Sequence, residues 1–157
     1  ISRNNALGLV QIRPYMPEDL KALQWVALGS NVFNAMIPVY PGVDKMPEYL
    51  SKAYVKPTTE NFYWVNRIIG ALADAHFYEN QSNIERYQLS VDRKLYEMIR
   101  KFDQEFQEKE PEDKKAFFEA ANQEISDFIQ EKTTELLDKV LFTSSCLMRN
   151  GFSRSDA

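Results

Sequence analysis

Apolar residues in the first forty positions of the chain alternate with polar ones or form short blocks, and turn-forming residues separate the blocks. This pattern is typical of β-strands. Glycine, serine and asparagine at Gly29, Ser30 and Asn31 form a turn signal, and Pro38 and Pro41 close the last block. In the second block both alternating faces are largely apolar, as in a strand that is covered on both sides. We therefore predict three antiparallel strands, the last two forming a hairpin, at residues 7–13, 23–29 and 32–37.

From Asn61 onward the apolar residues recur at spacings of three and four, which indicates helices. The first helix carries the stripe from Phe62 to His76, and Thr58 or Thr59 can cap its start by accepting a backbone hydrogen bond. This helix presents a wide apolar face, so we expect it to pack against the core.

Two longer helices are predicted after it. One runs from about Ser82 to Glu108, and Pro111 suits the first turn of the next, which Asn150 and Gly151 are expected to end. Because each helix carries one long apolar stripe, we expect them to pack as an antiparallel helical hairpin.

These elements predict an α+β fold, with about three antiparallel strands followed by a long helical hairpin or three-helix region. Residues 1–45 would supply the strands, 46–60 a linker and 61–157 the helical region. Three strands with two apolar faces need more strands or covering layers than the helices can provide. The chain also begins at Ile1 rather than at a methionine. We therefore expect it to be a part of a longer protein.

Composition and charge exclude several classes of function. With 157 residues, 44% of them hydrophobic, the chain can bury a core of one domain. The formal net charge of −4 gives no basic excess for binding nucleic acid. No apolar run is long enough to span a bilayer. A single cysteine cannot form an internal disulfide, and this favours a cytoplasmic setting.

Candidate chemistry is sparse. One histidine and one cysteine, far apart in the chain, do not make a metal site, so we expect no bound metal. His76 fits a partly buried core position. Cys146 lies late in the last helix, at the wrong end of the helix dipole for a reactive thiolate, and we expect it to be a small packing residue. The one unusual polar cluster contains Ser30, Asn31 and Asn34, which fit either ordinary turn chemistry or amide donors for a substrate.

Three segments, Leu23 to Tyr40, Glu60 to Phe77 and Asn150 to Ala157, resemble the dipeptidase A type of cysteine dipeptidases. These enzymes belong to the N-terminal-nucleophile hydrolase superfamily. The resemblance implies a four-layer αββα sandwich, hydrolysis of dipeptides without a cofactor, and a nucleophilic cysteine at the mature N-terminus whose own α-amino group is the base. This sequence departs from that pattern, since its first residue is Ile1 and Cys146 does not match the nucleophile.

The resemblance therefore implies the C-terminal portion of a dipeptidase, with no catalytic residue in this chain and no activity on its own. Its partners would be the dipeptide, the remainder of the parent chain and further copies in a homo-oligomer, but neither nucleic acid nor a membrane. Ser30, Asn31 and Asn34 are the candidates for substrate or oxyanion contacts. Two alternatives remain open at this point. The chain could be a helical interaction or assembly module without catalysis, or part of a related amidase.

Overall fold

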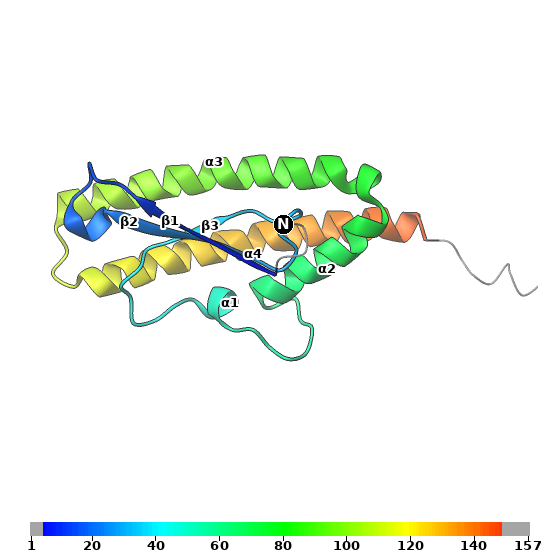
Figure 1. Cartoon of the computed structure of the whole chain (residues 1–157), viewed down its shortest axis with the longest axis horizontal. Helices are drawn as coiled ribbons and strands as arrows, with labels where there is room; N and C mark the ends of the chain where they lie inside the picture. The colour runs from blue at the N-terminus through cyan, green and yellow to red at the C-terminus, as the bar shows by residue number, and fades with distance from the viewer. Residues whose placement is uncertain (1–4, 149–157) are drawn as a thin grey trace, which may run out of the picture.

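A computed structural model describes residues 5–148 of the chain. Three strands come first, followed by four α-helices, the last two of them long (Figure 1), which confirms the predicted α+β class. The elements are β1 (Ala6–Ile12), the short 3-10 helix η1 (Glu18–Leu20), β2 (Ala22–Leu28), β3 (Ile37–Val39), α1 (Glu48–Ser51), α2 (Phe62–Ala75), α3 (Phe77–Lys109) and α4 (Lys114–Cys146).

The strands form one antiparallel sheet in the order β1-β2-β3. The prediction of the first two strands is confirmed to within one residue at each end, but the third was placed too early. Phe33 donates its backbone N–H to the carbonyl of Ser30 at 2.9 Å, and Asn34 Nδ2 donates to the carbonyl of Leu28 at 2.7 Å. These bonds hold residues 31–34 in a turn and delay the third strand until Ile37.

Pro38 was expected to close the third strand, and it instead lies inside β3, opposite Trp25. Proline has no backbone N–H, so within a sheet it is confined to edge strands. β3 is such an edge, since it pairs only with β2 in the described part of the chain.

The sheet is covered on one side more than on the other. In β2, Leu23, Trp25 and Ala27 are buried, whereas Val26 and Leu28 on the opposite face are half-buried. The expected cover on both faces is thus incomplete in this chain. β1 is exposed on both faces along nearly its whole length, and it leaves a free edge and apolar surface at the side of the molecule.

α2 begins with a cap other than the predicted threonines. The side chain of Asn61 accepts the backbone N–H of Trp64 at 3.2 Å, which satisfies a donor that the first helical turn leaves unpaired. At its other end α2 stops at His76, and α3 begins with the next residue instead of at Ser82. His76 is half-buried, as predicted.

α3 and α4 form the predicted antiparallel hairpin and lie side by side along the length of the molecule (Figure 1). The left-handed conformation of Glu110, with φ of 42°, ends α3. Asp113 caps α4 by accepting the backbone N–H of Ala116 at 3.0 Å. Pro111 therefore precedes the helix rather than lying in its first turn. The predicted stop at Asn150 and Gly151 lies outside the described residues.

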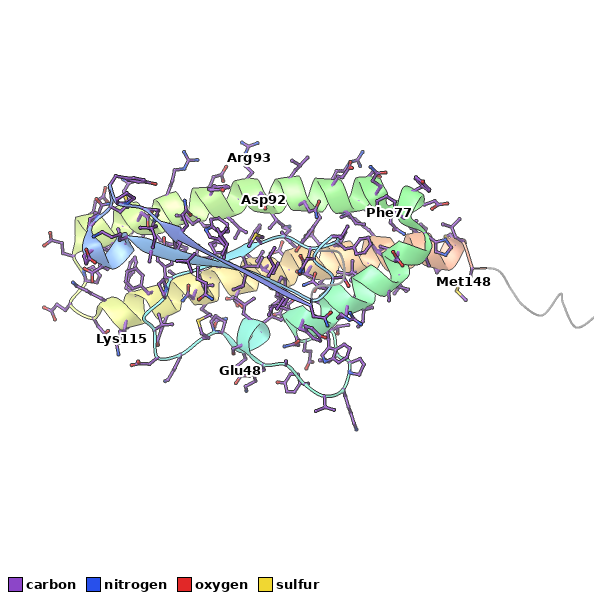
Figure 2. The ribbon with its side chains drawn as sticks, viewed as in Figure 1. Glu48, Phe77, Asp92, Arg93, Lys115 and Met148 are labelled. Atoms are coloured by element: carbon purple, nitrogen blue, oxygen red, sulfur yellow. The ribbon has the colours of Figure 1, made fainter. Side chains whose placement is uncertain are left out.

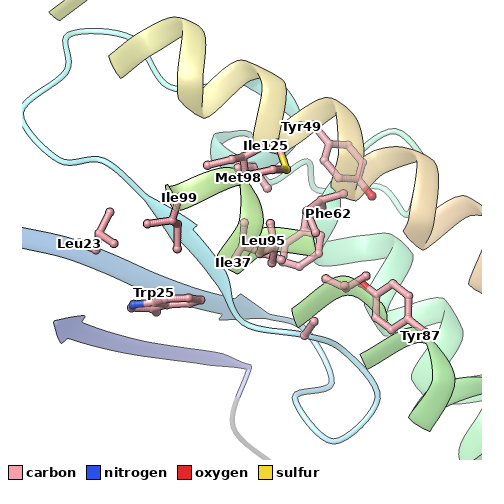
Figure 3. Close-up of a cluster of buried hydrophobic side chains, with 14 of the residues drawn as sticks. Leu23, Trp25, Ile37, Tyr49, Phe62, Tyr87, Leu95, Met98, Ile99 and Ile125 are labelled. Carbon is pink, nitrogen blue, oxygen red and sulfur yellow. The ribbon is translucent and has the colours of Figure 1, made fainter. Parts of the chain in front are cut away.

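One continuous core joins the sheet to the helices (Figure 3). Leu23 and Ile37 from the strands pack with Leu95 from α3 and Ile125 from α4. The segment 46–60 also takes part, because the α1 residue Tyr49 is buried in the same cluster.

Buried polar groups fix the end of β3 to α4. The Asn122 side chain accepts the backbone N–H of Tyr40 at 2.9 Å and donates to the Tyr40 carbonyl at 3.0 Å. The Tyr40 ring stacks on Phe118, with ring centroids 5.0 Å apart. Together these contacts hold the sheet against the hairpin in one position.

Candidate functional site

A concave surface between β1 and α3 consists of two adjoining cavities. One has a volume of about 790 Å³ and the other about 540 Å³. Gln11 and Tyr96 line both. We call the two cavities together the β1–α3 cleft. It is the best candidate site in the described residues, because ligands bind preferentially in concave surfaces of this size.

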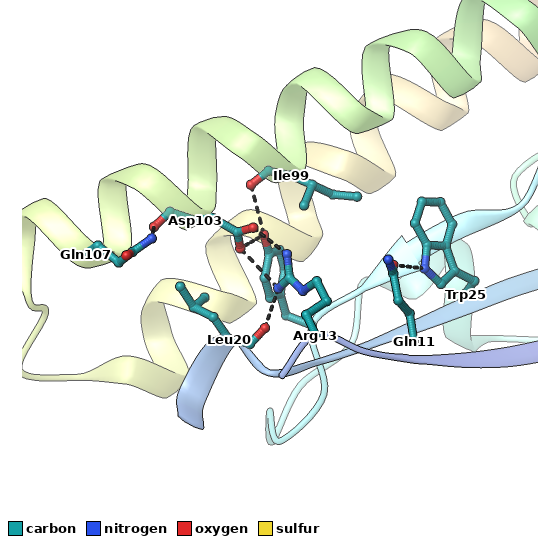
Figure 4. A network of polar contacts seen from close by, with 8 residues as sticks. Gln11, Arg13, Leu20, Trp25, Ile99, Asp103 and Gln107 are labelled. Carbon is teal, nitrogen blue, oxygen red and sulfur yellow. Dashed lines mark hydrogen bonds and ion pairs between the residues drawn. The ribbon is translucent and has the colours of Figure 1, made fainter. Parts of the chain in front are cut away.

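The larger cavity is built on a buried ion pair between the end of β1 and α3 (Figure 4). The guanidinium of Arg13 contacts both carboxylate oxygens of Asp103, with Nη2 3.2 Å from Oδ1, and also donates to the carbonyl of Leu20. The Tyr40 hydroxyl donates to Asp103 Oδ1 at 2.9 Å. Burial, and secondly the nearby Asp103 carboxylate, raise the pKa of Tyr40, so this hydroxyl keeps its proton.

The boundary between the two cavities is held by a contact between the strands. The indole N–H of Trp25 donates to Gln11 Oε1 at 2.9 Å (Figure 4), which fixes the orientation of the Gln11 amide. The Trp25 ring packs against Tyr96 of α3, with centroids 5.5 Å apart. This contact sets the distance between β2 and α3 at the middle of the cleft.

The smaller cavity has a carboxylate on its wall. Asp92 lines it together with Gln88, whose Nε2 donates to the backbone carbonyls of Val32 at 3.1 Å and Asn34 at 2.9 Å. Partial burial raises the pKa of Asp92 above its ordinary value, although the residue remains exposed to solvent. The next residue, Arg93, extends outward from α3 (Figure 2).

The three candidates from the sequence do not share one site. Asn34 is buried and lines the smaller cavity, where its Nδ2 is used by the Leu28 carbonyl and its Oδ1 has no hydrogen-bond partner. Ser30 lies on the other side of the turn, against Gly70 of α2. Asn31 is half-buried in the turn between them. A role of any of these residues in binding substrate stays a prediction.

Sequence reasoning missed the residues that shape the β1–α3 cleft. The position of Asp103 next to Phe102, within an apolar stripe, could have indicated a buried ion pair, since a buried carboxylate must be paired. The four-residue spacing of Asp92, Tyr96 and Arg100 could also have indicated a shared polar face, because residues four apart lie on one face of a helix.

Other chemistry finds little support in residues 5–148. These residues contain no group of three or more metal-binding side chains. Cys146 is exposed at the end of α4, so the expectation that it packs in the core was wrong. Among the described helices, none combines the length and the apolar character that a membrane span requires.

Comparison with known proteins covers nearly the whole chain. It is 37% identical to "Probable dipeptidase A" of Streptococcus pyogenes serotype M18 over 156 residues, which are 99% of this chain and 32% of that protein. It is 34% identical to "Dipeptidase" of Bifidobacterium longum, again over 99% of this chain and over 36% of the relative. With "Dipeptidase A" of Lactobacillus helveticus the identity is 30%, over 94% of this chain and 31% of the relative.

The chain thus spans about a third of the length of the curated relatives that it matches. Residues 1–90, which contain the sheet, α2 and the start of α3, match Peptidase family C69. The matched part includes Gln11 and Arg13 on the strand side of the cleft. The chain therefore belongs to Peptidase family C69.

Proposed function

We propose that this chain forms one part of a dipeptidase, in which it supplies the sheet edge and helical hairpin beside the substrate site. The observation that carries this proposal is the alignment of nearly the whole chain with relatives that are named dipeptidases. The β1–α3 cleft supports it, because its volume suits a small peptide and its walls carry charged and amide groups.

The nucleophile in this proposal comes from outside the chain. Cys146 is exposed at the end of α4 and is not among the residues that line the β1–α3 cleft. We infer that a cysteine at the mature N-terminus of a longer protein attacks the peptide carbonyl, with its own α-amino group as the base. The amine product leaves, and water then releases the acyl group from the sulfur. The 157 residues alone are then inactive. A reducing compartment, the cytoplasm, suits such a thiol.

The exposed strand β1 supports a further part of the proposal. Leu9 is 54% exposed on the face toward α3, and Val10 and Ile12 are 66% and 61% exposed on the other face. An uncovered apolar strand with a free edge readily pairs with another strand. We infer that other residues of the longer protein pair with β1 and cover this surface. Isolated copies of the chain would associate through the same surface.

A chimera tests the proposed function. The segment of the Streptococcus pyogenes relative that aligns with this chain is replaced by the 157 residues, since the alignment covers 99% of them. We expect the chimera to hydrolyse dipeptides, whereas the relative without its aligned segment and the 157 residues alone do not. Replacement of Cys146 by serine should leave the activity of the chimera unchanged. A folded chimera that leaves dipeptides intact would contradict the proposal.

A further inference from the structure

α3 presents one row of polar side chains to the β1–α3 cleft. Asp92, Tyr96 and Arg100 follow one another at intervals of four residues, so they lie on one face of the helix. Asp92 lines the smaller cavity, Arg100 the larger one, and Tyr96 both. The cleft therefore has a carboxylate toward one end and a guanidinium toward the other.

Neither of these charges is neutralised within the described part of the chain, where Asp92 and Arg100 form no ion pair. Their neighbours on α3 differ, because Arg93 and Lys94 both pair with Glu97. The other charged pair in the cleft, Arg13 and Asp103, is neutral as a unit. Glu108 also lines the larger cavity, two helical turns beyond Arg100.

The spacing of the two charges suits a small zwitterion. Eight residues of helix separate the Cα atoms of Asp92 and Arg100 by about 12 Å. An extended dipeptide spans about 7 Å between its ends. The side chains of Asp92 and Arg100 can close the remaining distance from the two sides, and the long Arg100 side chain provides most of the adjustment.

The middle of the cleft offers hydrogen-bonding groups for a peptide unit. The Oε1 of Gln11 is engaged by the Trp25 indole, which leaves its Nε2 as a donor at the boundary of the cavities. The Tyr96 side chain borders the same point from α3. At the base of the smaller cavity, the unpaired Oδ1 of Asn34 adds negative potential on the side of Asp92.

We propose that the β1–α3 cleft binds a dipeptide by its two ends, with Asp92 on the α-ammonium group, Arg100 on the α-carboxylate and Gln11 beside the peptide unit. The identity of the ligand rests on the proposed dipeptidase function, whereas the assignment of the two ends rests on the cleft.

The test is an NMR titration of the 157-residue chain with L-alanyl-L-alanine, its N-acetyl derivative and its C-terminal amide. We expect the free dipeptide to shift the amide signals of β1 and of residues 92–100, and each blocked derivative to bind more weakly. Asp92→Asn should weaken the free dipeptide about tenfold or more, the loss of one charged hydrogen bond, and leave the N-acetyl derivative unchanged. Arg100→Gln should weaken the free acid in the same way and leave the amide unchanged.

Two exposed residues outside the cleft provide charge-matched controls. Asp138→Asn on α4 changes the net charge as Asp92→Asn does, and Arg93→Gln on the outer side of α3 changes it as Arg100→Gln does. Both controls should leave all three affinities unchanged. Absence of dipeptide binding would overturn the assignment. Equal losses of affinity for free and blocked ligands in the Asp92 or Arg100 variants would also overturn it. Such a result would mean that these side chains do not recognise the charged ends of the dipeptide.

The chimera separates this inference from the proposed function. In an active chimera, Asp92→Asn and Arg100→Gln should raise KM for the free dipeptide with little change in kcat. An active chimera with unchanged KM in both variants would overturn the cleft assignment and leave the dipeptidase function standing. An inactive chimera together with end-selective binding by the chain would overturn the dipeptidase function and leave the cleft assignment standing.

Discussion

Arg13 and Asp103 are 90 positions apart in the sequence and form a buried ion pair that joins the end of β1 to α3. Removal of one partner leaves the other charge buried without compensation, which costs about 3–5 kcal/mol. We expect Arg13→Ala to lower the free energy of unfolding by an amount in this range, measured by urea denaturation.

Two further variants identify the cause. Lys101→Ala breaks the surface pair with Glu124 and should cost less than about 1 kcal/mol. The double variant Arg13→Met, Asp103→Leu removes both charges and should recover most of the stability. A loss in the double variant as large as in Arg13→Ala would show that packing, rather than the unpaired charge, is responsible.

Gly70 is the position on α2 where a side chain has no room. A Cβ there would lie 2.4 Å from Oγ and 2.5 Å from Cβ of Ser30. Alanine favours a helix over glycine by about 1 kcal/mol, but overpacking costs about 1–3 kcal/mol. We expect Gly70→Ala to lower the melting temperature, and Ser30→Gly in the same chain to restore it.

Gly8→Ala on β1 is the matched control, because nothing lies within 4 Å of its added Cβ. Its melting temperature should stay near that of the parent. If Gly70→Ala were instead stabilising, Ser30 would be free to move away from α2.

The ionisation of Asp92 makes the free energy of unfolding depend on pH. Burial raises its pKa in the folded chain above the value in the unfolded chain, so ionised Asp92 disfavours folding. Above the raised pKa the carboxylate is charged in both states and the full cost applies. Below the ordinary pKa both states are protonated and the cost disappears. Because Asp92 is exposed and solvent screens its charge, Asp92→Asn should stabilise the chain only slightly at neutral pH.

The gain should fade as the pH is lowered through the raised pKa toward the ordinary one, which parallel urea titrations can measure. Asp138→Asn, on the surface of α4, is the control for the general effect of charge. A gain that grew with acidity would contradict the sign of the effect.

The apolar surface of β1 predicts self-association of the isolated chain. Val10 is 66% exposed on this edge strand, and lysine on an edge strand opposes pairing between chains. We expect the chain to form dimers or larger species in light scattering at high concentration, and Val10→Lys to shift them toward monomer. Val55→Lys adds the same charge at a loop residue that is 97% exposed and should have little effect. A strictly monomeric parent chain would contradict the prediction.

Local patterns were sufficient to predict most elements of the fold. The apolar periodicity located β1, β2 and the long hairpin, because each depends on which face of the element is buried. It placed the third strand too early because residues 32–37 are as apolar as a strand. A local polar contact that apolar periodicity does not record decides the outcome there, since the amide of Asn34 bonds to the carbonyl of Leu28 and stabilises a turn.

The candidate site was harder to predict, because it is made by elements far apart in the sequence. Ser30 and Asn34 are neighbours in the chain, yet the turn directs one toward α2 and the other toward α3. Arg13 and Asp103 meet only once the sheet lies on the hairpin. The spacing along the sequence predicts that Asp92, Tyr96 and Arg100 share one helix face. It does not predict which strand faces them.

The short connection between α3 and α4 has a consequence for the order of folding. Each helix has 33 residues, and only residues 110–113 separate them, so their contacts close a small loop. The sheet, in contrast, must meet α3 across most of the chain, which is slow for entropic reasons. Within this chain the contacts of the hairpin should therefore form before those of the sheet. We expect α3 and α4 to become structured first and to provide the surface on which the strands then pack.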